Sequence, residues 1–271
     1  MAAASEHALT SAERAFYCTT LEVFERAGID VLVGGAYAFA RYTGIERHTK
    51  DFDVFVHARD FDRTLAALEN AGYDTSVPFP HWLGKAYCGE YFVDVIYGSG
   101  NGVALVDDEW FEQATLETVF DKTVMLVPIE EMLWSKALIQ ERERFDGADV
   151  AHLLLKRADV LNWRRLLRRF GSDWRVLLAH LILFGYIYPG ERDRIPAWVL
   201  HELLRRLRTC MSAPTLDERT CRGTLLSRQQ YLVDVEQWGF EDVRLYPDNA
   251  MSETDIAIWT AGIAEDGSDN T

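Results

Sequence analysis

The sequence has few of the residues that build disulfide-rich or zinc-stabilised proteins. Its four cysteines are scattered, with no CxxC spacing, at Cys18, Cys88, Cys210 and Cys221. We therefore expect isolated reduced thiols, and the alternatives are a structural zinc ion or a disulfide between Cys210 and Cys221. No two histidines have zinc-ligand spacing, and no GxSxG or Cys–His signature indicates a covalent nucleophile.

Long hydrophobic runs are also missing. The longest, residues 176–188, is too short to cross a bilayer and contains His180, which favours a buried core helix. The first ten residues, MAAASEHALT, have neither a basic region nor a long apolar run, so we expect no signal peptide. Together these features predict a cytoplasmic protein.

Positive charge is scarce. The formal net charge is −15 and the pI about 4.9, so the chain as a whole repels a phosphate backbone. This argues against broad nucleic-acid binding but leaves room for a local basic patch. Hydrophobic residues make up 48% of the 271 residues, which is enough for one large core or two ordinary ones.

The pattern of apolar residues changes at Pro128. Before it, strand patterns at residues 31–33, 52–56, 82–87, 91–97 and 124–127 alternate with helical patterns at 11–28, 36–42 and 59–70. After it, residues 129–140, 148–157, 161–169, 173–186, 197–211 and 225–238 favour helices, and residues 212–224 a polar loop. We predict an α+β fold with two domains, a mixed sheet with flanking helices at 1–128 and an all-helical domain at 129–271. The acidic tail near 265–271 is expected to be disordered.

Residues 31–56, VLVGGAYAFARYTGIERHTKDFDVFV, carry the most informative pattern. Gly34 and Gly35 follow a short strand and open a helix, where free backbone N–H groups can receive phosphates. Asp51 and Asp53 are two residues apart on the next strand, so both side chains lie on the same face. Paired carboxylates are the ligands by which Mg²⁺ binds together with substrate phosphates.

A third carboxylate, Asp94, stands inside the apolar run YFVDVIYG. Burying a lone carboxylate is costly, so its position implies a metal ion or a cation partner. Taken singly, each of these features has an ordinary alternative: a glycine turn, a solvated Asp-x-Asp, a satisfied buried Asp. Their order along the chain is more specific than any one of them.

That order resembles the nucleotidyltransferase superfamily related to DNA polymerase beta, over roughly residues 15–128. The matching residues are Gly34, Gly35, Ala36, Ala38, Arg47, Thr49, Asp51, Asp53 and Asp94. The resemblance implies a nucleotidyltransferase-type mixed sheet and transfer of a nucleoside monophosphate from a triphosphate, with pyrophosphate leaving. It also implies two Mg²⁺ ions (Mn²⁺ as the alternative) on Asp51, Asp53 and Asp94, and nucleotide binding by Gly34, Gly35, Arg47 and Thr49.

Many members have Gly-Ser where this chain has Gly34-Gly35, which removes one hydroxyl contact to phosphate. In having Gly-Gly here, the chain resembles the bacterial branch that includes the AbiEii-type toxins, in which this form is common. By that resemblance Lys136 acts in catalysis and reaches the triphosphate, and Asp149 binds the nucleotide, with Asp146 as the competitor for that role. In isolation, a lysine on an amphipathic helix is more often a solvated charge.

Arginines recur in the helical half at Arg164, Arg165, Arg168 and Arg169, which fall along one side of a helix. A second cluster lies at Arg205, Arg206 and Arg208. Such a stripe is most often a solvated face, and the alternative is a surface that contacts the phosphates of an RNA acceptor or of the triphosphate.

The acceptor is less defined than the donor. An RNA end, most simply tRNA, follows from the toxin-like resemblance, which also implies a cognate antitoxin. An aminoglycoside or lincosamide antibiotic is the alternative, and the net charge of −15 favours a cationic drug. A protein hydroxyl is a third acceptor. A non-catalytic module of the same fold, binding nucleotide or protein, is a different class of function, against which the three crowded carboxylates argue.

Overall fold

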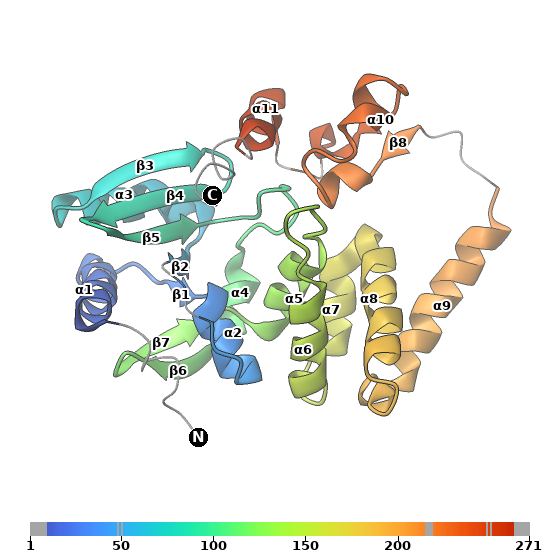
Figure 1. Ribbon diagram of the computed structural model, residues 1–271, viewed down its shortest axis with the longest axis horizontal. Helices are drawn as coiled ribbons and strands as arrows, with labels where there is room; N and C mark the ends of the chain where they lie inside the picture. The colour runs from blue at the N-terminus through green and yellow to red at the C-terminus, as the bar shows by residue number, and fades with distance from the viewer. Residues whose placement is uncertain are drawn as a thin grey trace. The chain divides into compact units, whose positions relative to one another are not determined.

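The computed structural model describes residues 10–47, 49, 51–214, 219–247, 249 and 251–262 (Figure 1). They fall into two compact units. The first contains the described residues up to Pro128 together with those from Met251 onward, and the second spans Ile129–Asn249. The expected disordered tail near 265–271 lies outside the described residues.

The first unit is built on a seven-stranded sheet in the described part of the chain, with the order β3-β4-β5-β2-β1-β7-β6. The sheet is mixed, because β2 pairs parallel with β5 and β1 parallel with β7, while the other neighbours are antiparallel. The strands are β1 (Leu32–Val33), β2 (Asp51–Phe55), β3 (Asp74–Phe79), β4 (Leu83–Cys88), β5 (Tyr91–Ile96), β6 (Thr115–Val119) and β7 (Lys122–Leu126).

Helices flank this sheet at α1 (Ser11–Ala27), α2 (Gly35–Thr43), α3 (Phe61–Asn70), α4 (Asp108–Glu112) and α11 (Glu253–Ala261). A capping box between Thr10 and Glu13 starts α1, and Gly28 ends it in the left-handed conformation that glycine adopts without strain. The ring of Tyr17 on α1 packs against those of Phe52 and Phe120, with centroids 4.7 and 5.5 Å away. An aromatic core therefore lies directly behind β2.

The second unit contains α5 (Ile129–Ala137), α6 (Gly147–Arg157), α7 (Trp163–Phe170), α8 (Trp174–Ile187), α9 (Ala197–Ser212) and α10 (Leu232–Glu236). The apolar helix α8 packs against α5, α6, α7 and α9. Its His180 is buried and lies 3.0 Å from the Ala137 carbonyl, as a core histidine should. None of the helices in the described residues is both long and apolar enough to span a membrane.

The fold class is confirmed: a mixed sheet with flanking helices is followed by a largely helical region. The hairpin expected from residues 82–97 is present as β4 and β5. All four cysteines are free, so Cys210 and Cys221 form no disulfide.

Three details of the second half differ from expectation. The helix predicted at 225–238 is wrong except at Leu232–Glu236, because the Glu141 carboxylate binds the Ser227 hydroxyl and the Arg228 N–H and holds this segment in a turn. The second unit is not all-helical, since β8 (Thr220–Cys221) and β9 (Glu241–Asp242) form a short parallel pair.

The third difference is α11, which the sequence-based division places in a domain at 129–271. This helix packs instead on β3 of the first unit. Its buried Trp259 ring meets the His81 ring edge-on at 6.4 Å, so this large aromatic side chain contributes to the packing of the helix there.

Candidate functional site

Strand β2 places two carboxylates side by side. Its residues alternate between half-buried and buried, so Asp51 and Asp53 share the accessible face, while Phe52 and Val54 are fully buried behind them. The Thr49 hydroxyl accepts a hydrogen bond of 3.1 Å from the Asp51 N–H, at the point where the strand begins. Thr49 therefore fixes the backbone beside the first carboxylate.

The glycine pair lies directly against this strand. The Gly34 N–H donates to the Asp53 carbonyl at 3.0 Å, and Gly34 is the N-cap of α2. Gly35 has φ +53°, and a Cβ there would lie 1.7 Å from Oδ2 of Asp53. A side chain at this position would require the Asp53 carboxylate to move and would be strained by the positive φ, so both features favour glycine at position 35. The same contact puts Asp53 at the positive end of the α2 dipole.

Asp94 is brought to the same part of the sheet by strand pairing. Strands β2 and β5 are parallel neighbours, and Asp53 is the register partner of Asp94. The Asp94 side chain is 12% exposed. Burial raises the pKa of Asp94 above its usual value, the charge of Lys85 lowers it without cancelling the effect, and the Asp51 carboxylate adds to the rise.

Lys85 is a residue of the candidate site that the sequence analysis did not identify. It lies opposite Asp94 in the β4–β5 pair, its Nζ is 2.8 Å from Oδ1 of Asp94, and it sits 4.4 Å above the centre of the Phe92 ring. The signal was available, because a two-residue turn at Gly89-Glu90 fixes Cys88 opposite Tyr91. Counting outward along both strands then pairs position 85 with position 94. The cation partner expected for a buried Asp94 is thus a lysine.

The donor set fits Mg²⁺ bound to a triphosphate better than a bare ion. No three acidic, histidine or cysteine side chains gather closely enough, within the residues described, to hold a metal by themselves. Asp51 and Asp53 nevertheless offer hard oxygens on an accessible face, and Mg²⁺ binds through one or two carboxylates completed by substrate phosphates. Oδ1 of Asp94 is bonded to Lys85, so Asp94 would become a third ligand through Oδ2 or by exchanging that partner.

Arg47, expected to bind the nucleotide, is exposed on the loop that precedes β2. Its guanidinium lies 4.9 Å from the centre of the Phe39 ring on α2. The structure therefore places Arg47 over the helix that begins at the glycine pair.

In the second unit, Lys136 is bound by Asp146 and Asp149, the two candidates for the nucleotide-binding aspartate. Its Nζ lies 2.8 Å from Oδ2 of Asp146 and 2.7 Å from Oδ2 of Asp149. Burial works to raise the pKa of Asp146, but the Arg144 hydrogen bonds and the Lys136 charge outweigh it and leave that pKa lowered. Both aspartates are therefore partners of the same lysine.

The expected stripe of four arginines is wrong as a single surface. Arg165 is buried and bonds Glu130 and Glu131 at 2.5 and 2.6 Å, and Arg169 bonds Glu131 at 2.8 Å. Helix α5 presents two adjacent glutamates to α7, and the ion pairs with them bury Arg165 and most of Arg169. The remaining arginines, Arg164 and Arg168, line a pocket described below.

No protein-family model matches the chain, and no curated protein is significantly similar to it. The chain is similar to the antibiotic-resistance factor ANT(2'')-Ia at 12% identity, over 75% of this chain and 95% of that one, with a TM-score of 0.40. It is also similar to the lincosamide antibiotic adenylyltransferase LnuA bound to lincomycin (19% identity, 54% and 96% coverage, TM-score 0.38). A third is an antigenic nucleotidyltransferase-like protein from Paracoccidioides brasiliensis (16% identity, 71% and 99% coverage, TM-score 0.44). Likenesses this distant assign neither a family nor an activity to this chain.

Proposed function

We propose that this chain is a metal-dependent nucleotidyltransferase, which moves a nucleoside monophosphate from a nucleoside triphosphate to an acceptor hydroxyl. The observation that carries the proposal is the position of Asp53. It shares a face of β2 with Asp51, is in register with Asp94, and lies against Gly35 at the start of α2. Carboxylates for a metal ion and helix N–H groups for phosphates therefore meet at one side chain.

Each part of this arrangement has a role in binding the donor. The backbone N–H groups that open α2 receive the triphosphate, and the absence of side chains at Gly34 and Gly35 lets it approach closely. Asp51 and Asp53 would hold the Mg²⁺ ions, or Mn²⁺ ions in their place. When bound, these ions would neutralise the negative charge that develops on the reacting phosphate and on the leaving pyrophosphate.

Asp94 is suited to take the proton of the acceptor. As the acceptor oxygen bonds to the α-phosphorus and the bond to pyrophosphate breaks, the hydroxyl proton passes to an Asp94 carboxylate oxygen. The raised pKa of Asp94 makes it a stronger base than an exposed aspartate, and the Lys85 ammonium at 2.8 Å keeps it ionised until then. Lys85 acts here as a positioning residue for Asp94.

The roles of Lys136, Asp149 and Arg47 in binding the nucleotide belong to the same proposal. Lys136 is held by two carboxylates, and if it exchanges Asp146 for a triphosphate, Asp146 keeps Arg144. A Lys136→Arg variant preserves the charge and should raise KM for the triphosphate less than Lys136→Met. Equal KM values for both variants and the unmodified protein would remove Lys136 from the site.

For the acceptor we propose an RNA end, with tRNA as the first candidate, in line with the AbiEii-like resemblance and its implied antitoxin. The support is local positive charge on α7 and α9 in an otherwise acidic chain. A cationic aminoglycoside, or a lincosamide, is the competing acceptor, and the net charge of −15 favours the former.

Release of pyrophosphate tests the catalytic assignment. The chain is incubated with each nucleoside triphosphate, Mg²⁺ and total cellular RNA, and Asp51→Ala combined with Asp53→Ala should abolish release. The matched control, Asp62→Ala with Asp74→Ala, removes two exposed charges from the same unit. A site variant that releases pyrophosphate at the unmodified rate would refute the proposal.

Labelled triphosphates then identify the acceptor. Separate incubations with total tRNA, total protein and a panel of aminoglycosides and lincosamides show which pool takes the label. Label confined to the drugs would replace the RNA acceptor by a small molecule, and label confined to protein would indicate nucleotidylation of a protein hydroxyl.

A further inference from the structure

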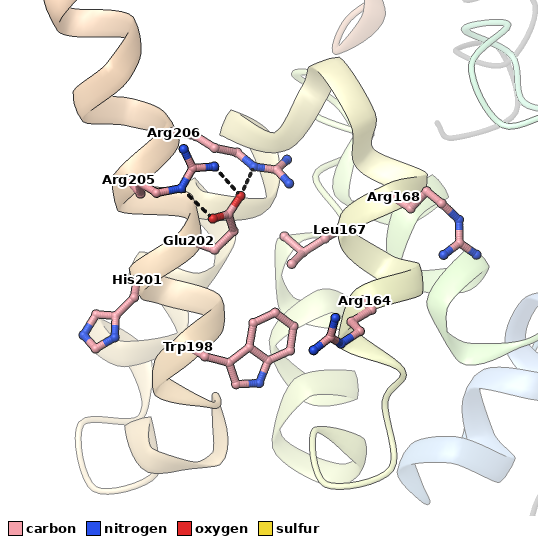
Figure 2. Close-up of a pocket in the computed structure, with 8 residues that line it drawn as sticks. All are labelled: Arg164, Leu167, Arg168, Trp198, His201, Glu202, Arg205 and Arg206. Carbon is pink, nitrogen blue, oxygen red and sulfur yellow. Dashed lines mark hydrogen bonds and ion pairs between the residues drawn. The ribbon is translucent and has the colours of Figure 1, made fainter.

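A pocket of about 840 Å³ lies in the second unit between α7 and α9 (Figure 2). This α7–α9 pocket falls within the range of small-ligand sites, roughly 300–1,000 Å³. It is open to solvent and is lined by Arg164, Leu167, Arg168, Trp198, His201, Glu202, Arg205 and Arg206.

The charge of the pocket is opposite to that of the chain. Its lining has four arginines and one glutamate, a positive excess in a protein with a net charge of −15. A cationic drug would be repelled from this position, whereas an anion would be drawn to it. The lining of the pocket is therefore better suited to a negatively charged ligand than to a cation.

At one end of the pocket an aromatic ring meets a guanidinium. Arg164 on α7 lies 5.7 Å from the centre of the Trp198 ring on α9, and Figure 2 shows both side chains in the space between the helices. Trp198 is 44% exposed, a large apolar surface left open to solvent beside the buried Leu167. An exposed indole next to an arginine is a platform on which a nucleic-acid base can stack.

At the other end Glu202 holds two guanidiniums in place. It bonds Arg205 through Nε and Nη2 and Arg206 through Nε, at 2.8 Å each. A guanidinium has five N–H donors, so both arginines retain donors that Glu202 does not occupy. In Figure 2 the Arg206 side chain reaches toward α7, while Arg168 and His201 point away from the space between the helices. Arg206 and Arg164 thus present donors to the same space.

We propose that the α7–α9 pocket binds single-stranded RNA, with a base stacked on Trp198 and a phosphate held by Arg164 and Arg206. Fixed arginines and a stacking ring are the combination by which proteins hold single strands without reading their sequence. The inference deepens the proposed function and rests on it for the role of the RNA as acceptor. Binding itself requires no turnover and can be measured separately.

The test is equilibrium binding of a short, fluorescently labelled oligoribonucleotide to the full chain across a series of salt concentrations. Trp198→Ala should weaken binding about tenfold, since stacking of one base is lost, and Trp198→Phe should recover most of it. Arg206→Glu should weaken binding and lower the salt slope by about 0.7, one phosphate contact to a single strand.

Arg208→Glu is the matched control, because it makes the same charge change on the same helix at an exposed position outside the pocket. Circular dichroism melting checks that each variant is folded. The proposal is overturned if Arg206→Glu and Arg208→Glu weaken binding equally, or if Trp198→Ala binds like the unmodified chain. Competition by free ATP as tight as by the oligonucleotide would also overturn it, in favour of a mononucleotide site.

The same assay separates this inference from the catalytic proposal. Asp51→Ala combined with Asp53→Ala should bind the oligonucleotide normally while releasing no pyrophosphate. Normal catalysis with unaltered RNA binding in the pocket variants would refute the pocket alone, and RNA binding without any catalysis would refute the enzyme alone.

Discussion

Two buried aspartates, one in each unit, have pKa values that are shifted in opposite directions. Burial is the largest influence on both Asp94 and Asp146, and in both it acts to raise the pKa. Asp146 forms ion pairs with Lys136 and Arg144, and together these lower its pKa below the usual value. Asp94 forms an ion pair with Lys85, and the nearby negative charge of Asp51 opposes the effect of that lysine. The pKa of Asp94 therefore stays above its usual value.

A raised pKa by itself does not mark a reactive carboxylate; what the proposed function needs is a carboxylate that still has room for an added cation. In the second unit, buried acids meet matching cations, as Glu130 and Glu131 meet Arg165 and Arg169, although burial still raises the pKa of Glu131 above its usual value. On the sheet, Asp51 and Asp53 stand half-buried on an accessible face next to a carboxylate whose pKa is already raised. Carboxylates crowded in this way can be stabilised by an added cation, which is the property that a metal-dependent site needs.

The largest effect expected from this comparison is on catalysis at Asp94. Asp94→Asn keeps the shape and the hydrogen bond from Lys85 but cannot accept the acceptor proton, so pyrophosphate release should fall by about 10²- to 10⁴-fold. The melting temperature should change little, because a neutral amide is easier to bury than a carboxylate. Release within a factor of two of the unmodified rate would place Asp94 outside the catalytic machinery.

The counterpart in the second unit is a large loss of stability. Glu131→Gln leaves Arg165 and Arg169 buried without their shared carboxylate, and the free energy of unfolding should fall by about 3–5 kcal/mol in urea titrations. The control, Glu191→Gln, breaks an ion pair whose glutamate is 45% exposed, and it should cost at most about 1 kcal/mol. Equal losses for the two variants would show that the buried cluster is not structural.

The carboxylates on the sheet and the glutamate–arginine cluster of the second unit also show which features could be predicted from sequence. Asp51, Asp53 and the glycine pair were predictable, because alternation along one strand and a strand–glycine–helix order are local patterns. Lys85 depends on the register of a hairpin, and Arg165 on glutamates more than thirty residues away. The Lys85–Asp94 and Arg165–glutamate contacts join different elements of the fold, and a local sequence pattern does not predict such contacts.

The strands show the same limit. The strands in the interior of the sheet were predicted from their apolar runs, whereas β3 and β6 were not, and these two lie at its edges. Strand β6 is exposed at four of its five positions, and β3 has no buried residue and contains Pro78. An edge strand buries too little surface to leave an apolar pattern in the sequence.

A smaller effect is expected from Lys85, and it tests whether a metal ion can replace the lysine. Lys85→Met removes the ion pair between Lys85 and Asp94 and should lower the free energy of unfolding by about 1–3 kcal/mol. If Asp94 can bind a metal, Mg²⁺ with a non-hydrolysable triphosphate should raise the melting temperature of this variant more than that of the unmodified chain. An equal rise in both would restrict the metal ligands to Asp51 and Asp53.

The smallest expected effect is the pH dependence contributed by Asp146. Its pKa is lower in the folded chain than in the unfolded chain, so the stability it adds is fully present above its unfolded pKa of about 3.9 and is lost as pH falls through the folded pKa. Arg144→Gln removes one cation and brings the two pKa values closer. Because the Arg144 side chain is 62% exposed, we expect the variant to lose at most about 1 kcal/mol near neutral pH.

The loss in Arg144→Gln should shrink as the solution is acidified, since protonated Asp146 gains nothing from either cation. Urea titrations between neutral pH and the acid limit of folding would measure this as a flatter dependence of stability on pH than in the unmodified chain. Arg142→Gln, two residues earlier and exposed, changes the same charge and should leave that dependence unaltered. A parallel flattening in both variants would mean that net charge, and not the Asp146 pairing, governs the acid response, and the contrast between Asp146 and Asp94 would then lose its electrostatic basis.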